Sequence, residues 1–261
     1  MAITSDHAIV DNIPHAYQFT KGNSLYRCVA FVLAALSAFA YPKKFAGANL
    51  NTLASGIYQH YAGQDIDTNT NGMTKEQAVD YLNAAHIGYV DLQHLVDQGG
   101  DYEALRAEMA AMNCQGVPQL LTIADESHLH YAPNGEKLHN WNDSGLSHCI
   151  VRLGMDEHDT VGYYLDPAAP VPPFTYPTPI KWEDIVACRP ITALGIMPPG
   201  VEAPPAGFSY QNAKWPTPEP VVNLDNAAST LHSISSAMDQ LQNAIAAVKA
   251  ASANALHDLG K

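Results

Sequence analysis

The sequence predicts an α+β fold in which N-terminal helices pack on an antiparallel sheet. Helical patterns occupy the first part of the chain, and short β-branched or aromatic runs follow them. Elements grouped in this way favour an antiparallel sheet, because a parallel sheet needs helices that alternate with strands. With 261 residues, the chain is long enough for one large domain or two small ones.

Helical structure is predicted mainly in the N-terminal half. Four helices are expected, over residues 24–41, 50–61, 74–88 and 101–113. The first contains a nearly unbroken apolar run, which predicts a buried helix, and Pro42 ends it. In the third, Thr74 and Gln77 stand at the spacing of a capping box.

The hydrophobic period then shortens from helical to strand spacing. The runs typical of strands are VPQLLTI, CIVRLG, VGYYLD and ITALGIM. Between the last two, KWEDIVAC predicts one short amphipathic helix. The sheet is therefore expected to form within residues 117–197.

Proline divides the chain into three parts. Fourteen of the eighteen prolines lie between Pro167 and Pro220. We predict a domain over residues 1–197, a proline-rich arm or linker over 198–222 and a C-terminal amphipathic helix over 223–261. Apolar residues of this tail alternate by three and four, at Leu231, Ile234, Met238, Leu241, Ile245 and Val248. The helical tail either forms a coiled coil or folds back onto its own domain.

Composition argues against several kinds of partner. The formal net charge of −13 argues against nucleic acid, whose binding needs clustered Lys and Arg. The longest apolar run is too short to span a bilayer, and the first residues lack the basic and apolar regions of a signal peptide. Four widely spaced cysteines fit neither a disulfide framework nor a zinc ribbon. We expect synthesis in the cytoplasm, and neither a metal nor a cofactor.

Cys28 stands at the head of the first apolar helix. Asn23 or Ser24 can cap that helix, so Cys28 falls within its first turns. Free backbone N–H groups and the helix dipole stabilise a thiolate at such a position, especially beside a histidine. By itself the position is more typical of a buried structural cysteine, because free Cys is among the most buried residue types.

A histidine and an aspartate stand at the two ends of a predicted hairpin. A hairpin centred on Glu157 pairs residues whose numbers sum to about 314, and His148 and Asp166 meet that condition. We therefore expect their side chains to be cross-strand neighbours on one face. A carboxylate beside an imidazole fixes its tautomer and stabilises imidazolium, as a Cys–His pair requires. Cys28, His148 and Asp166 are thus candidate catalytic residues.

The order of these residues resembles that of papain-like cysteine peptidases of the double-glycine-leader (bacteriocin-processing) type, and more closely their stand-alone bacterial and phage relatives. Those relatives open with a Pro-x-x-x-Gln segment before the Cys-headed helix, and here Pro14, Gln18 and Cys28 stand in that order. Further likenesses are the TKEQ helix, the GVPQLLTI strand, the YYLDP strand end and the KWEDI helix. The resemblance covers about residues 12–197.

The resemblance implies a papain-like fold with a Cys-His-Asp triad. It makes Cys28 the nucleophile, His148 the proton carrier and Asp166 the residue that orients His148. It also makes Gln18 the oxyanion donor, with Asn23 as the alternative. Two residues beside the cysteine depart from the family pattern, because Val29 replaces a usual Gly and Arg27 replaces a usual acidic or polar residue.

Two other polar segments offer metal-binding alternatives. HLHYAPNGEKLH brings His128, His130 and His139 together in sequence, but a solvated loop, or a flap that overhangs the cleft, is the favoured interpretation. DIDTNTNG begins like a calcium loop at Asp67, but Ala78 stands where the twelfth-position Glu is needed. A turn that caps the following helix is favoured there.

The leading functional hypothesis is a cysteine peptidase that cleaves amide bonds of a peptide or of a peptidoglycan cross-bridge. Water or an amine could accept the acyl group, and the sequence leaves both open. The alternative is a catalytically weak or inactive papain-fold structural or adhesive subunit of a phage virion or another assembly, which oligomerises through residues 223–261. The two are compatible if an assembly carries the peptidase in or on a virion.

Overall fold

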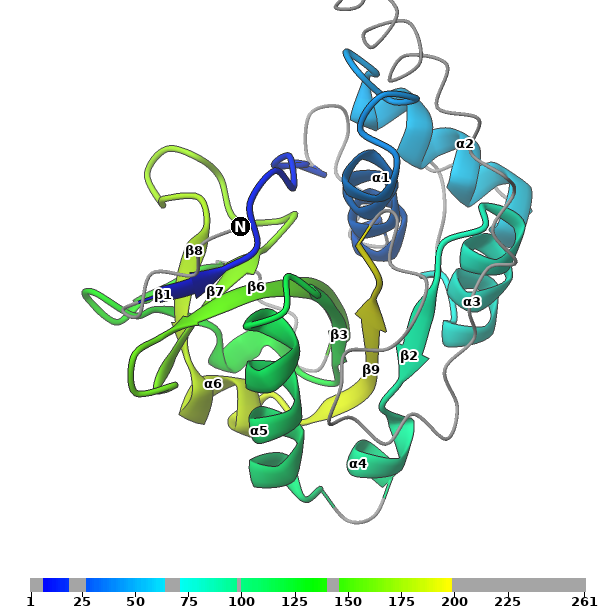
Figure 1. The fold of residues 1–261 in the computed structure, drawn as a ribbon. Coiled ribbons are helices and arrows are strands. Elements are labelled where there is room, and N and C mark those ends of the chain that lie inside the picture. Colours follow the sequence, from blue (N-terminus) through cyan, green and yellow to red (C-terminus); the bar gives the residue numbers. More distant parts are fainter. Residues whose placement is uncertain (1–6, 19–26, 64–70, 98–99, 140–145, 199–261) are drawn as a thin grey trace, which may run out of the picture. The chain divides into compact units, whose positions relative to one another are not determined.

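A computed structural model describes residues 7–18, 27–63, 71–97, 100–139 and 146–198. They form a mixed α+β structure with an antiparallel sheet, which confirms the predicted fold class at that level (Figure 1). Asn23, the calcium-loop-like segment around Asp67, the arm from residue 199 onward and the tail over 223–261 lie outside the described residues. The coiled coil and the assembly role of the tail therefore stay predictions.

Seven strands of the described ranges form one antiparallel sheet. Along its main path lie β2 (Tyr89–Asp91), β9 (Pro190–Ile196), β3 (Gln119–Ile123), β6 (His148–Asp156), β7 (Val161–Leu165) and β8 (Thr178–Lys181), and β1 (His7–Ile9) pairs with the far end of β6. The strands β4 (His130–Tyr131) and β5 (Glu136–Lys137) form a separate pair. All four predicted strands are present. The unpredicted β8 contains Pro179, which an edge strand tolerates because its outer N–H needs no partner.

The helices match the predicted ones, with two short additions. They are α1 (Cys28–Ala40), α2 (Leu50–Ala62), α3 (Lys75–Ala84), α4 (Gln93–Asp97), α5 (Tyr102–Asn113), α6 (Trp182–Ala187) and the 3-10 helix η1 (Glu126–His128), of which α4 and η1 were not predicted. The predicted start of the first helix is wrong, because α1 begins at Cys28 and its N-cap is Arg27, which forms no side-chain cap. The helix begins where the apolar run begins, since tertiary burial outweighs a polar cap in setting its start.

The sheet separates two hydrophobic clusters. On one face, Leu120 and Val151 pack with α1, α2 and α3. On the other face, Leu121 and Ile150 pack with α4, α5 and α6, so neighbours along one strand point to opposite layers. Figure 1 shows α1 end-on beside the sheet, with α2 and α3 outside it. Every residue of α1 except Ala38 is buried, which confirms the predicted buried helix.

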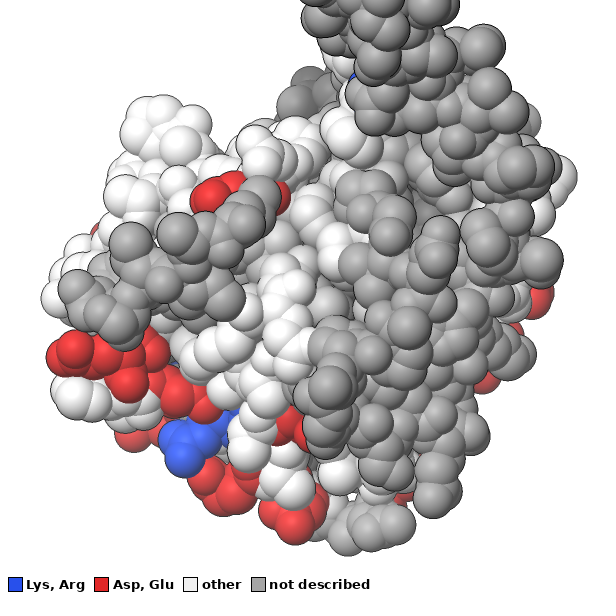
Figure 2. Space-filling view, in the orientation of Figure 1, with Lys and Arg blue, Asp and Glu red and all other residues white. Residues whose placement is uncertain are grey.

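The described surface and helices bear on two kinds of partner that the sequence argues against, a membrane and a nucleic acid. None of the helices in the described ranges combines the length and hydrophobicity needed to cross a bilayer. On the face shown in Figure 2, acidic side chains cover more of the described surface than basic ones, in line with the net charge of −13. Such a surface repels the phosphates of a nucleic acid.

Thr74→Ala is expected to lower the free energy of unfolding by about 1 kcal/mol. The predicted capping box is confirmed, because Thr74 Oγ1 accepts from Gln77 N at 3.3 Å and Gln77 Oε1 accepts from Thr74 N at 2.8 Å. Urea denaturation measures the loss. Thr52→Ala is the matched control, since Thr52 is exposed on α2 and that helix is capped by Asn49. Equal losses in both variants would contradict the role of the box.

Candidate active site

Cys28 is the first residue of α1, and its side chain faces the sheet. The residue is only 5% exposed and belongs to the cluster on the α1 side of the sheet. The first intrahelical hydrogen bond runs from Phe31 N to Arg27 O at 3.2 Å. The N–H groups of the first helical residues therefore have no partner inside α1, and the positive end of its dipole lies at the thiol. This is the environment expected for a stabilised anion.

His148 opens β6, and Asp166 follows the last residue of β7. His148 Nε2 lies 2.8 Å from Asp166 Oδ1, so the predicted pair is formed. The predicted register is wrong, because Val151 pairs with Leu165 and facing residues sum to 316. Asp166 therefore lies diagonally across from His148, beyond the end of β7, and not directly opposite it. The four-residue turn causes the shift, because facing residues beside it sum to 317, and a bulge between Arg152 and Gly154 then lowers this sum to 316.

The Asp166 carboxylate is fully buried and has three hydrogen-bond partners. Besides His148, its Oδ1 accepts from Ala168 N at 2.9 Å, and its Oδ2 lies 2.9 Å from His139 Nε2. Burial raises the pKa of Asp166, but His139 and His148 outweigh burial and hold this pKa well below its usual range. An ionised carboxylate only accepts hydrogen bonds, so Nε2 of each histidine carries the proton. When the His148 ring is neutral, a lone pair is then left on its Nδ1.

The thiol of Cys28 reaches the same histidine. Cys28 lies close enough to the His148 ring to influence its pKa, and Nδ1 is the nitrogen that remains for the thiol because Asp166 occupies Nε2. Burial lowers the pKa of His148, but Asp166 and Cys28 outweigh burial and bring this pKa well above its usual value. Cys28 and Asp166 therefore both act on the His148 ring, the thiol through its effect on the pKa and the carboxylate through a hydrogen bond.

The backbone of Gln18 forms hydrogen bonds with Arg27 and Pro167, the residues next to Cys28 and Asp166 in the sequence. Its N–H donates to Pro167 O at 2.8 Å, and its carbonyl accepts from Arg27 Nη1 at 3.3 Å. The side chain is fully buried, yet no described residue hydrogen-bonds to its amide nitrogen or oxygen. An unpaired buried amide costs stability, which is expected of a group kept for a ligand. Arg27 thus positions Gln18, and Val29 packs into the core.

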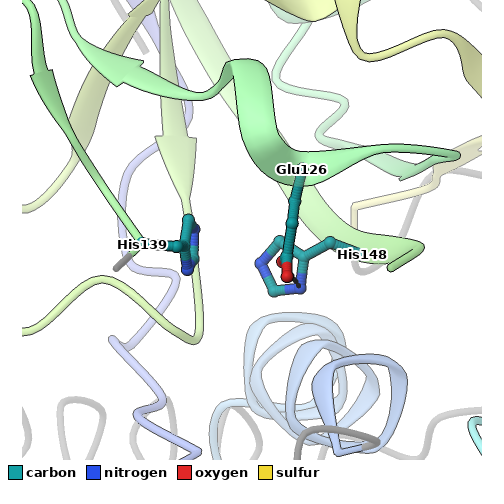
Figure 3. Close-up of side chains that lie close together, drawn as sticks. All are labelled: Glu126, His139 and His148. Atoms are coloured by element: carbon teal, nitrogen blue, oxygen red, sulfur yellow. Dashed lines mark ion pairs between the residues drawn. The ribbon is translucent and has the colours of Figure 1, made fainter. Parts of the chain in front are cut away.

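Two further polar side chains, which the sequence did not assign to the site, meet the His148 ring (Figure 3). Glu126 Oε2 lies 3.7 Å from His148 Nδ1. The rings of His139 and His148 lie edge to face, with centroids 5.1 Å apart. The sequence signal for Glu126 was its place just after β3, because antiparallel pairing puts Ile123 opposite His148. His139 belongs to the histidine-rich segment that the sequence offered as a metal alternative or a flap over the cleft, and it follows the β4–β5 hairpin.

The Glu126 carboxyl group is buried without a hydrogen-bond partner among the described residues. It is 4% exposed, and no described residue hydrogen-bonds to either of its oxygens. Burial raises the pKa of Glu126 to about 7, against the opposing effects of His148 and His139. Within the described ranges, Glu126, His139 and His148 form a group able to hold a metal ion, with one donor atom from each lying within 4.8 Å of the others.

The histidine-rich segment is not the solvated loop that its polarity predicts. His128 is exposed, but His130 Nδ1 lies 3.5 Å from Asp184 Oδ2, and the two leucines of the segment are buried. Ala132 N donates to Pro179 O at 2.9 Å, so the β4–β5 hairpin packs against β8. Of the three histidines, only His139 reaches the site, because the hairpin turns it back toward Asp166. The free energy gained by burying these two leucines outweighs the preference of the polar residues for solvent.

No protein-family model matches the chain, and no curated protein matches it. The resemblance to papain-like peptidases therefore rests on the order of the quoted residues. The geometry of Cys28, His148, Asp166 and Gln18 is independent of that resemblance, because it follows from hydrogen bonds and burial.

Glu126→Gln is expected to remove a pH-dependent loss of stability. The ordinary pKa of Glu126 is 4.5, and in the folded protein burial, with Asp166 and Asp125 adding and the two histidines opposing, raises it to about 7. The unfolded chain therefore loses this proton first, so wild-type stability falls as the pH rises between these values. The fall amounts to about 3 kcal/mol when complete.

Urea denaturation at about pH 5 and about pH 8, in buffer containing EDTA, measures this effect. The stability of Glu126→Gln relative to wild type should increase at the higher pH. Glu103→Gln is the control, because Glu103 is exposed on α5. A difference between Glu126→Gln and wild type that stays constant with pH would show that Glu126 ionises normally.

Proposed function

We propose that this chain is a cysteine peptidase with a papain-like catalytic domain, in which Cys28, His148 and Asp166 cleave amide bonds. The observation that carries the proposal is the convergence of Cys28 and the buried Asp166 carboxylate on the His148 ring, to which Asp166 is hydrogen-bonded. A nucleophile, a base that activates it and a group that orients the base are the parts needed for covalent amide hydrolysis.

His148 first acts as the base. Asp166 keeps the ring proton on Nε2, so Nδ1 accepts the proton of the Cys28 thiol. The thiolate attacks the carbonyl carbon of the substrate, a C–S bond forms, and the carbonyl electron pair moves to oxygen. The start of α1 stabilises this negative charge, because its N–H groups and dipole point toward it.

His148 then acts as the acid. Its Nδ1 proton passes to the leaving amine while the C–N bond breaks, which leaves a thioester on Cys28. Neutral His148 next takes a proton from water, and the resulting hydroxide attacks the thioester and releases a carboxylic acid and the thiol. An amine in place of water would give acyl transfer by the same steps.

Gln18 supplies the second donor for the oxyanion. The first is the N–H of Cys28, which has no partner inside α1. The Gln18 amide is buried and unpaired among the described residues, and its backbone is fixed at both N–H and carbonyl. A donor that is already oriented loses little entropy when charge develops on the substrate oxygen, which is the condition for effective stabilisation.

The burial of the site favours flexible substrates. Cys28 is 5% exposed, so the scissile carbonyl must approach closely while little of the thiol is open to solvent. An extended peptide or a peptidoglycan cross-bridge meets this condition, because its chain presents single amide bonds without a bulky folded surface. These substrates therefore fit the site better than a loop held rigidly on a globular protein.

Cys28→Ala is expected to lower amide cleavage by about 10³-fold or more, because no other group can form the thioester. Cleavage is measured with a peptide library and with purified peptidoglycan, each with and without iodoacetamide. Cys114→Ala is the matched control, because Cys114 is a half-buried thiol at the end of α5. An unchanged rate in Cys28→Ala would rule out the proposed function.

Gln18→Ala is expected to lower kcat by about 10²–10³-fold with little change in KM, because the amide acts on charge present only in the transition state. Steady-state kinetics on the best substrate of the library measures kcat and KM separately. Gln119→Ala is the control, since Gln119 is an equally buried glutamine on β3. A rise in KM at constant kcat would assign Gln18 to ground-state binding instead.

A further inference from the structure

Three electron-pair donors converge beside the His148 ring. They are a carboxylate oxygen of Glu126 and one ring nitrogen each of His139 and His148, all within 4.8 Å of one another (Figure 3). Glu126 Oε2 and His148 Nδ1 are 3.7 Å apart. Ligand atoms of a tetrahedral zinc site stand about 3.4 Å apart, so a small contraction suffices. All three residues are buried, which limits competition from water.

Asp166 orients both imidazoles in the way that metal sites require. It accepts from His148 Nε2 at 2.8 Å and from His139 Nε2 at 2.9 Å. When a carboxylate takes one N–H of a histidine, the lone pair of the other nitrogen is directed toward a metal. One buried carboxylate thus holds both imidazoles of the cluster, although a Cys–His pair needs only one.

Glu126 is the independent observation that points to a cation. It is more than nine-tenths buried, its carboxylate points at His148, and no described residue hydrogen-bonds to its oxygens. A carboxylate in such a place is costly unless a cation or a donor compensates it. The proposed peptidase reaction gives Glu126 no role, and its ion pair with His148 is long, at 3.7 Å.

We propose that Glu126, His139 and His148 bind one divalent cation of the zinc class. Two imidazoles and one carboxylate are a ligand set that suits Zn²⁺, with a fourth position left for water or a thiolate. Mg²⁺ and Ca²⁺ require six or more oxygen ligands, and this cluster supplies a single carboxylate.

The bound ion would also control the proposed peptidase, and this part rests on the proposed function. An ion held by Glu126 and His148 would occupy His148 Nδ1, the nitrogen that lies 3.7 Å from Glu126 Oε2 and that the Cys28 thiol also needs, because Asp166 holds Nε2. Metal binding and thiol activation therefore exclude each other. The metal-bound protein is latent, and removal of the ion releases the base.

The test is zinc binding by the full chain, which needs no substrate. ZnCl₂ is titrated into reduced protein against a chromophoric zinc indicator. We expect one zinc per chain with a Kd of about 1 µM or tighter. Glu126→Gln and His139→Ala should each weaken binding at least about tenfold. His128→Ala is the matched control, because His128 is exposed on the same η1 helix and outside the cluster.

Thermal melting in EDTA shows whether each variant folds, and the wild-type stoichiometry needs no variant. The proposal is overturned if wild-type protein binds no zinc, or if Glu126→Gln and His139→Ala bind it as tightly as wild type. A loss in His128→Ala equal to theirs would overturn it too.

The two proposals fail separately. Zinc binding at these residues without thiol-dependent cleavage would support the metal site and remove the peptidase. Thiol-dependent cleavage that zinc-saturated and EDTA-treated proteins perform at equal rates would support the peptidase and overturn metal control.

Discussion

The buried carboxylate of Asp166 is the interaction on which the site depends. An ionised carboxylate away from water costs several kcal/mol unless hydrogen bonds replace its hydration. Two imidazole N–H groups and the N–H of Ala168 do so here. Because this carboxylate only accepts, it also decides the tautomer of both rings. The proposed reactivity of Cys28 and the proposed ligand role of His139 and His148 both depend on that single constraint.

The antiparallel sheet explains how distant segments reach Asp166. In such a sheet, the end of one strand lies beside the start of the next. The end of β3, the start of β6 and the end of β7 therefore lie side by side at one end of the sheet. Glu126, His148 and Asp166 stand at or just beyond these strand ends. The buried helix α1 brings Cys28 to the same edge. Rigid, buried elements thus hold every group of the proposed triad, which favours a fixed geometry.

His148 Nδ1 is the atom for which the two proposed chemistries compete. The proton of the Cys28 thiol, the Glu126 carboxyl group and the proposed metal ion would each interact with this nitrogen. Glu126 Oε2 lies 3.7 Å from it. A site of this kind has more donors than one reaction needs. That surplus distinguishes it from a minimal Cys-His-Asp arrangement, and in our proposal it lets a metal ion compete with the Cys28 thiol for His148.

Sequence alone determined the class of the fold, the buried first helix, the capping box at Thr74 and the pairing partners Cys28, His148 and Asp166. These depend on hydrophobic period, local capping and residue order, which are visible along the chain. The hairpin register, the start of α1 at Cys28, and the places of Glu126 and His139 were decided only by the tertiary structure. They depend on burial against segments far away in the sequence, and such burial outweighs local polarity and local caps.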